Sequence, residues 1–241
     1  MKASLFITCL VDQFFPEVGE STVNVLRKLG VDVSLPLGQT CCGQPAYNSG
    51  FNKEALSFAE QFITVFQDSE NIVVPSGSCA SMIKVFMPEM LANHPTLAEP
   101  ARALANRTYE FSQFLVNVLG VSNLGAARRD KVTYHASCHL LRELKASNES
   151  KLLIRNVKGS QFLPMRGEDE CCGFGGSFSI KFPDISNAIL NKKLANIKAT
   201  KAETVLACDS GCLMQIAGGL SRQKINARVM HLAQFLDQES S

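Results

Sequence analysis

Nine cysteines recur in two copies of one pattern, and this repeat constrains the fold of the 241-residue chain more than any other feature. Each copy has a lone cysteine, a Cys-Cys-Gly triplet and a final cysteine or pair of cysteines: Cys9, Cys41-Cys42-Gly43 and Cys79, then Cys138, Cys171-Cys172-Gly173, Cys208 and Cys212. Corresponding cysteines lie about 130 residues apart, a period far too long for a solenoid array. The repeat therefore predicts a duplicated unit, a fusion of two similar halves.

Each half alternates predicted strands with predicted helices. Short apolar runs typical of buried strands cover residues 4–8, 31–35, 72–74, 131–135, 160–163 and 204–207. Apolar residues at helical spacing cover residues 15–29, 52–66, 81–91, 108–119 and 184–197. This alternation predicts an α/β fold with two pseudo-symmetric Rossmann-like halves, each a small parallel sheet with flanking helices.

A polar, glycine-containing segment separates the halves. We predict a first cysteine-rich unit over residues 1–120, a linker over 121–130 and a second unit over 131–241. In both units the lone cysteine and the final cysteines follow predicted strands. Ligands bind at the carboxyl ends of parallel strands in α/β sheets, so each half is expected to gather its thiols in loops at one edge of its sheet.

The composition is that of a globular protein in a reducing compartment. Apolar residues make up 46% of the chain, charged residues 19%, and the net charge of +2 gives no reason to expect nucleic acid or an anionic membrane as a partner. The N-terminus lacks the apolar run of a signal peptide, and no stretch is long enough for a transmembrane segment. The odd number of cysteines and the presence of two adjacent pairs do not suit a disulfide framework. We therefore expect a cytoplasmic protein whose cysteines bind metal or take part in redox chemistry.

Clustered thiolates favour soft metals and iron–sulfur clusters. A zinc ion takes four ligands, which the first half offers, whereas the second half offers five. Neighbouring side chains in an extended segment point in opposite directions, so an adjacent pair of cysteines fits a larger cluster better than one small ion. The alternative is that the pairs are buried small hydrophobic residues.

The doubled Cys…Cys-Cys-Gly…Cys pattern resembles the cysteine-rich (CCG) domain family. That family includes a subunit of heterodisulfide reductase and the iron–sulfur subunits of glycerol-3-phosphate and glycolate oxidases. Nearly the whole chain is similar to the lactate utilization branch of the family, and the similarity is carried by GQTCCGQPAYNSG, YHASCHLLRE, CCGFGGSFSIKFPDIS and CDSGCLMQI.

The resemblance implies two pseudo-symmetric α/β halves with clusters between them. It also implies an iron–sulfur oxidoreductase subunit of a complex that oxidises L-lactate to pyruvate and allows the use of lactate as a carbon source. The partners would be the iron–sulfur protein B and protein C of the lactate utilization system, and the substrate a small 2-hydroxy acid. The chain would serve in electron transfer or host the oxidation together with its partners.

The family pattern also assigns ligands. In the second half every cysteine of the pattern is present, so a cluster of the [4Fe-4S] type is expected on Cys138, Cys171, Cys172, Cys208 and Cys212. In the first half Pro75 or Ser76 stands where the family has the leading member of its final cysteine pair. A second cluster or zinc is expected there, on Cys9, Cys41, Cys42 and Cys79.

Three residues beside the second pattern are candidates for catalysis. His135 and His139 flank Cys138, where a histidine can bind metal, donate a proton or tune a cluster by hydrogen bonding. Arg142 could pair with a substrate carboxylate. The sequence has no dinucleotide-binding fingerprint, which argues against a nicotinamide-dependent lactate dehydrogenase. Two alternatives remain: a thiol-disulfide enzyme like heterodisulfide reductase, and a zinc-stabilised structural module.

Overall fold

The computed structural model describes residues 1–237 and contains two parallel sheets, each with four strands. The first sheet has the order β2-β1-β3-β4, with β1 (Lys2–Leu5), β2 (Asp32–Ser34), β3 (Ile72–Val74) and β4 (Thr108–Glu110). The second has the order β6-β5-β7-β8, with β5 (Lys131–Tyr134), β6 (Gln161–Phe162), β7 (Thr204–Ala207) and β8 (Arg228–His231). The equivalent strand orders confirm the predicted α/β fold of two Rossmann-like halves.

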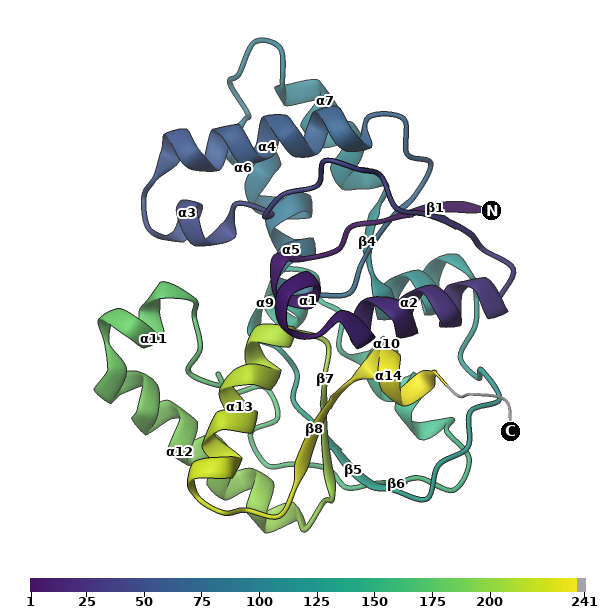
Figure 1. The fold of residues 1–241 in the computed structure, drawn as a ribbon, viewed down its shortest axis with the longest axis vertical. Coiled ribbons are helices and arrows are strands. Elements are labelled where there is room, and N and C mark those ends of the chain that lie inside the picture. The colour runs from purple at the N-terminus through teal and green to yellow at the C-terminus, as the bar shows by residue number, and fades with distance from the viewer. Residues whose placement is uncertain (238–241) are drawn as a thin grey trace.

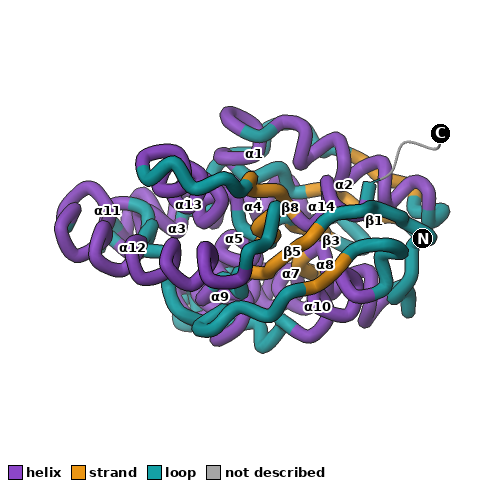
Figure 2. Tube along the Cα trace, turned by 90° about the horizontal axis from the view of Figure 1, so that it is seen from below, coloured by secondary structure: helices purple, strands orange, loops and turns teal. Residues whose placement is uncertain are grey.

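Helices surround the strands of both sheets (Figure 2). The first half contains α1 (Cys9–Phe14), α2 (Pro16–Lys28), α3 (Gln44–Asn48), α4 (Asn52–Phe66), α5 (Gly77–Ser81), α6 (Met87–Met90), α7 (Ala98–Asn106) and α8 (Phe111–Gln113). The second contains α9 (Cys138–Arg142), α10 (Asn148–Arg155), α11 (Ser177–Lys181), α12 (Pro183–Thr200), α13 (Ser210–Arg222) and α14 (Leu232–Leu236). Two π-helical turns, η1 (Met82–Phe86) and η2 (Phe114–Val118), continue α5 and α8. Among residues 1–237, no helix combines the length and apolar character needed to cross a membrane.

Helix α4 shows why these segments fold as predicted. It buries Ala55, Ala59, Phe62 and Phe66, which recur about one helical turn apart and so share one face. The rings of Phe62 and Phe66 pack edge-on against Phe6, at centroid distances of 5.4 and 5.6 Å. The apolar face of the helix is thereby fixed against the segment that follows β1.

Two strands differ from the expectation. The segment predicted as a helix over residues 108–119 begins as strand β4, and its helical part starts at Phe111. The sequence pattern also predicts no strand at β8. Strands this short show too few alternating positions to be distinguished by periodicity. In addition, the Glu110 side chain accepts hydrogen bonds from the amides of Ser112 and Gln113, so strand and helix adjoin without a turn.

The two halves meet where their strands end, and α1, α5 and α9 lie at the junction (Figure 1). Helix α5 of the first half packs against α9 of the second, and the amide of Gly77 donates a 3.0 Å hydrogen bond to the carbonyl of Cys208. A Cβ atom at position 77 would lie 2.8 Å from the Cβ of Leu140. Only glycine allows this approach of the two halves.

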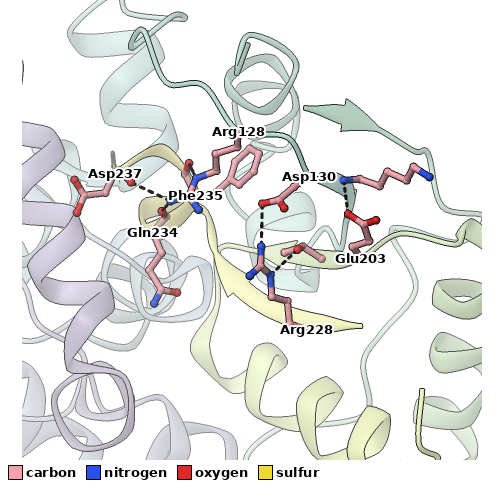
Figure 3. Close-up of polar contacts among 9 residues, drawn as sticks. Arg128, Asp130, Glu203, Arg228, Gln234, Phe235 and Asp237 are labelled. Atoms are coloured by element: carbon pink, nitrogen blue, oxygen red, sulfur yellow. Dashed lines mark hydrogen bonds and ion pairs between the residues drawn. The ribbon is translucent and has the colours of Figure 1, made fainter. Parts of the chain in front are cut away.

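The segment that connects the two sheets is hydrogen-bonded to the C-terminal helix (Figure 3). The Arg128 guanidinium donates to the carbonyls of Gln234, Phe235 and Asp237, which lie in the last turn of α14 and directly after it. Helix α14 in turn packs on α2 of the first half. The strands of each sheet fall inside the predicted units 1–120 and 131–241, whose exact limits stay a prediction. Residues 238–241 of the second unit lie outside the described part.

Candidate metal centre

A cavity of about 240 Å³ is lined by residues of both halves. Four cysteines come from each half: Cys9, Cys41, Cys42 and Cys79, and Cys138, Cys171, Cys172 and Cys212. The sequence repeat thus becomes a spatial arrangement in which two equivalent sets of thiols face a shared space.

The lone cysteines stand at the starts of helices. Cys9 opens α1 and Cys138 opens α9. The hydroxyls of Thr8 and Ser137 cap these helices by accepting from amides three residues further along. The sequence pattern predicts these thiols in loops, whereas the structure places them in the first helical turn. The short strand-to-helix connection holds each sulfur at the sheet edge.

The adjacent cysteines lie in loops that end in a left-handed glycine. Gly43 has φ +85° and Gly173 has φ +89°. Residues with side chains rarely adopt this region, and a Cβ at position 173 would also lie 2.5 Å from the carbonyl oxygen of Ser186. The third residue of the Cys-Cys-Gly triplet is therefore required by the backbone that turns each pair toward the cavity.

Cys79 belongs to α5 and Cys212 to α13, and the side chain of one aspartate contacts both helices. The Asp209 carboxylate caps α13 through the amide of Gly211, and it also accepts from the Ser78 amide at 2.9 Å and the Ser76 hydroxyl at 3.2 Å. One buried side chain therefore aligns Cys79 and Cys212. Asp209 is not among the residues predicted from the sequence, although an aspartate between a strand and a Ser-Gly-Cys segment is a helix-capping signal.

Within each half the thiols lie side by side as free cysteines. The Sγ atoms of Cys9 and Cys41 are 3.9 Å apart, and those of Cys172 and Cys212 are 3.3 Å apart. Both distances exceed the length of a disulfide bond, about 2.05 Å, and all nine cysteines are unbridged. The spacing leaves room for a bound centre between the sulfur atoms.

One cysteine in each half has a strongly lowered pKa. The pKa of the Cys41 thiol falls to about 3 because Cys42 and Cys9 donate hydrogen bonds to its sulfur. The pKa of Cys171 falls to about 2 because Cys138 and Cys172 do the same. The same contacts raise the pKa values of the donor thiols. Each half thus contains one cysteine that loses its proton more readily than its neighbours, in a set of sulfur donors that suits a soft metal or an iron–sulfur centre.

Cys208 does not line the cavity. Its side chain is fully buried, with the sulfur 3.7 Å from the Tyr134 hydroxyl and 3.3 Å from the Ser150 hydroxyl. Burial raises the pKa of this thiol well above its ordinary value. The first half has Pro75 at the equivalent place directly after its strand. The two halves therefore present equal numbers of thiols to the cavity.

The histidines and the arginine have different environments. His139 lines the cavity, with its Nε2 atom 3.5 Å from the Nε2 atom of Gln44. Arg142 is exposed and is not among the lining residues. His135 is fully buried, and one of its ring nitrogens lies within 4.8 Å of the sulfurs of Cys172 and Cys212.

The charge state of His135 follows from burial. Desolvation is the largest cause and repulsion from Lys193 the second, and together they lower the pKa of the imidazole to about 3. Attraction to Cys171 and a contact with the Glu168 backbone raise the pKa by less. The ring is therefore neutral at neutral pH. Lys193, which is also absent from the sequence-based candidates, is itself buried and donates to the carbonyl of Gly167 at 2.6 Å.

Comparison with known proteins identifies the repeat. The cysteine-rich domain family (CCG) matches twice, over residues 3–84 and 132–217. The chain is 46% identical over 237 residues to "Lactate utilization protein A" of Bacillus velezensis, covering 98% of this chain and 99% of the relative. The protein of the same name from Bacillus subtilis is also 46% identical with the same coverage. Among solved structures, glutamate racemase from Campylobacter jejuni reaches a TM-score of 0.35 at 12% identity over 98% of this chain and 83% of that chain.

Proposed function

Since the chain belongs to the cysteine-rich domain (CCG) family, we propose that it serves lactate utilization as the iron–sulfur subunit of a system that oxidises L-lactate to pyruvate. The resemblance expected from the sequence motifs is confirmed by relatives 46% identical over nearly the whole chain, named for lactate utilization. The observation that carries the proposal is the cavity lined by two equivalent sets of four cysteines.

The donor set fits an iron–sulfur centre in each half. Four thiols per half line the cavity, the pKa of one of them is strongly lowered by its neighbours, and none is bridged. In this proposal the first site is held by Cys9, Cys41, Cys42 and Cys79, and the second by Cys138, Cys171, Cys172 and Cys212. When bound, such a cluster accepts and passes on single electrons. The protein supplies the ligands, a largely apolar surrounding and fixed backbone.

The other lining groups suggest how a small 2-hydroxy acid could be held. Gln44 and His139 face each other across the halves, and Gln44 also donates to the Ser78 carbonyl at 3.1 Å. Either side chain can hydrogen-bond a hydroxyl or a carboxylate. Arg142 is exposed and does not line the cavity, so it is not part of this proposed substrate site.

We further propose that the chain works in the cytoplasm with two partners, an iron–sulfur protein and a third component. The sequence contains no nicotinamide or flavin fingerprint, so electrons need a route to another protein. The relatives' shared name points to a system of several proteins.

Anaerobic purification followed by reconstitution tests this function. The purified chain should be brown and contain iron and acid-labile sulfide. L-lactate oxidation by the three-component mixture should require it and should fall strongly with Cys172→Ser. Full oxidation without this chain, or a colourless protein with zinc alone, would contradict the proposal.

The 3.3 Å distance between the sulfurs of Cys172 and Cys212 supports a second candidate, a thiol-disulfide enzyme. Such an enzyme would form a disulfide between these cysteines during turnover. Trapping with an alkylating reagent under oxidising and reducing conditions distinguishes the two, since a cluster protects both cysteines from alkylation in the reduced protein.

A further inference from the structure

His135 occupies a position that has no polar counterpart in the first half. It lies two residues before the helix-capping Ser137, and Phe6 lies two residues before the equivalent cap, Thr8. Both side chains are buried. The repeat therefore places an imidazole in the second half where the first half has a phenyl ring that packs in the core.

The imidazole is buried without the hydrogen bonds that such a group requires. His135 is 0% exposed, neither Nδ1 nor Nε2 makes a hydrogen bond of ordinary geometry with residues 1–237, and the Glu168 backbone gives only a weaker contact that raises the pKa of the ring. Leaving a buried polar group unpaired destabilises the folded state. Phenylalanine at the same point of the first half avoids this cost, so the histidine calls for a specific explanation.

The groups around the His135 ring explain why a histidine stands at this position. A ring nitrogen of His135 and the Sγ atoms of Cys172 and Cys212 all lie within 4.8 Å of one another. Because metal–nitrogen and metal–sulfur bonds are about 2.0 to 2.3 Å long, atoms bound to one metal lie at most about 4.6 Å apart, and about 3.3 to 3.8 Å apart at the tetrahedral angle. The two sulfurs, 3.3 Å apart, have this spacing, and the ring nitrogen lies at most about 0.2 Å beyond the upper limit from either of them. Cys208, by contrast, contacts hydroxyl groups in the core.

We propose that His135 is a nitrogen ligand of the metal centre in the second half, alongside Cys172 and Cys212. This inference rests on the proposed metal-binding function and adds to it a difference between the two sites. The first half offers thiols alone, whereas the second offers thiols and a neutral imidazole. The two proposed centres would therefore differ in their donor atoms, with nitrogen present only in the second.

Labelling with ¹⁵N-histidine tests the assignment. The full chain is reconstituted anaerobically with ferrous iron and sulfide, reduced, and studied by pulsed EPR. A nitrogen coupling from a directly bound imidazole should change with the label, disappear in His135→Phe and persist in His94→Phe, because His94 does not line the cavity. A wild-type spectrum without a bound histidine nitrogen, or a coupling that survives in His135→Phe, would overturn the inference.

A second probe separates this inference from the proposed function. If the wild-type chain takes up no iron, the iron–sulfur function fails, and the histidine is then tested with Co²⁺ alone on the same protein. His135→Phe should weaken one Co²⁺ site at least about tenfold, whereas His94→Phe should leave the Co²⁺ affinities unchanged. Equal Co²⁺ affinities in wild type and His135→Phe would exclude His135 as a ligand.

Discussion

At the scale of single residues, the glycines of the two Cys-Cys-Gly triplets show how unequal two copies of one motif can be. Gly43 and Gly173 share a left-handed φ, but their surroundings differ. A Cβ at position 43 would meet the side chain of Phe58 at 3.1 Å, whereas a Cβ at position 173 would meet the carbonyl oxygen of Ser186 at 2.5 Å. A side chain can shift, but the backbone of α12 cannot shift without moving the helix.

Gly173→Ala is therefore expected to destabilise the protein more than the matched variant Gly43→Ala. The left-handed φ alone costs each variant about 1–2 kcal/mol, and the backbone clash adds to this cost only at position 173. Denaturant unfolding of both variants measures the difference. Equal losses of unfolding free energy would show that the clash is relieved without cost.

Glu110 has a protonation state that depends on folding. It is fully buried at the end of β4, and desolvation raises its pKa from 4.5 to about 7, even though Ser112 and Gln113 donate hydrogen bonds to it. The folded state therefore holds the proton more tightly than the unfolded state does. The associated stability is complete below pH 4.5 and is lost as the pH rises through about 7.

The free energy of unfolding of the wild type should fall by a few kcal/mol relative to Glu110→Gln between about pH 5 and about pH 8. The glutamine keeps an oxygen acceptor for the same amides but has no proton to lose. Urea unfolding of both proteins in the same metal state, at several pH values, checks this. A constant difference between the two proteins across that range would contradict the raised pKa.

At the scale of elements, the sequence predicts most of what positions the site. The apolar runs before the cysteines are strands, and the amphipathic segments are helices, because both signals depend on local burial. Strands β4 and β8 escape notice because they are short and each runs straight into a helix. The sequence also does not predict that the Cys208 side chain is buried in the core or that Arg142 is exposed. Such directions depend on packing against distant segments.

Helix α14 gives a prediction at this scale. The Arg128 side chain donates to three carbonyls at its C-terminal end and lies over the ring of Phe235. Arg128→Met should lower the unfolding free energy by about 1.5–3 kcal/mol, the worth of hydrogen bonds from a charged group. Arg129→Met, at the exposed neighbouring position, is the matched control and should have little effect. Equal stabilities of the two variants would contradict the role of Arg128 as an anchor.

At the scale of the whole molecule, the two halves of the duplicated fold meet where the strands of each sheet end. Asp209 and the Gly77 amide link the halves there, and the thiols of both halves open on one cavity. Neither half could build this cavity alone. Each of the two metal centres that we propose therefore depends on the packing of the other half as well as on its own cysteines.

The most direct test of this account is the iron and sulfide content of three serine variants after identical anaerobic reconstitution. Cys42→Ser and Cys172→Ser each remove a cavity-lining thiol from one half, while Cys208→Ser changes a thiol that contacts Tyr134 and Ser150 in the core. Only in the first two variants does a hard oxygen replace a sulfur that we propose as a metal ligand. The account predicts that each of these loses iron and sulfide while Cys208→Ser keeps the wild-type content. A loss in Cys208→Ser equal to that in Cys172→Ser, or wild-type content in all three, would contradict it.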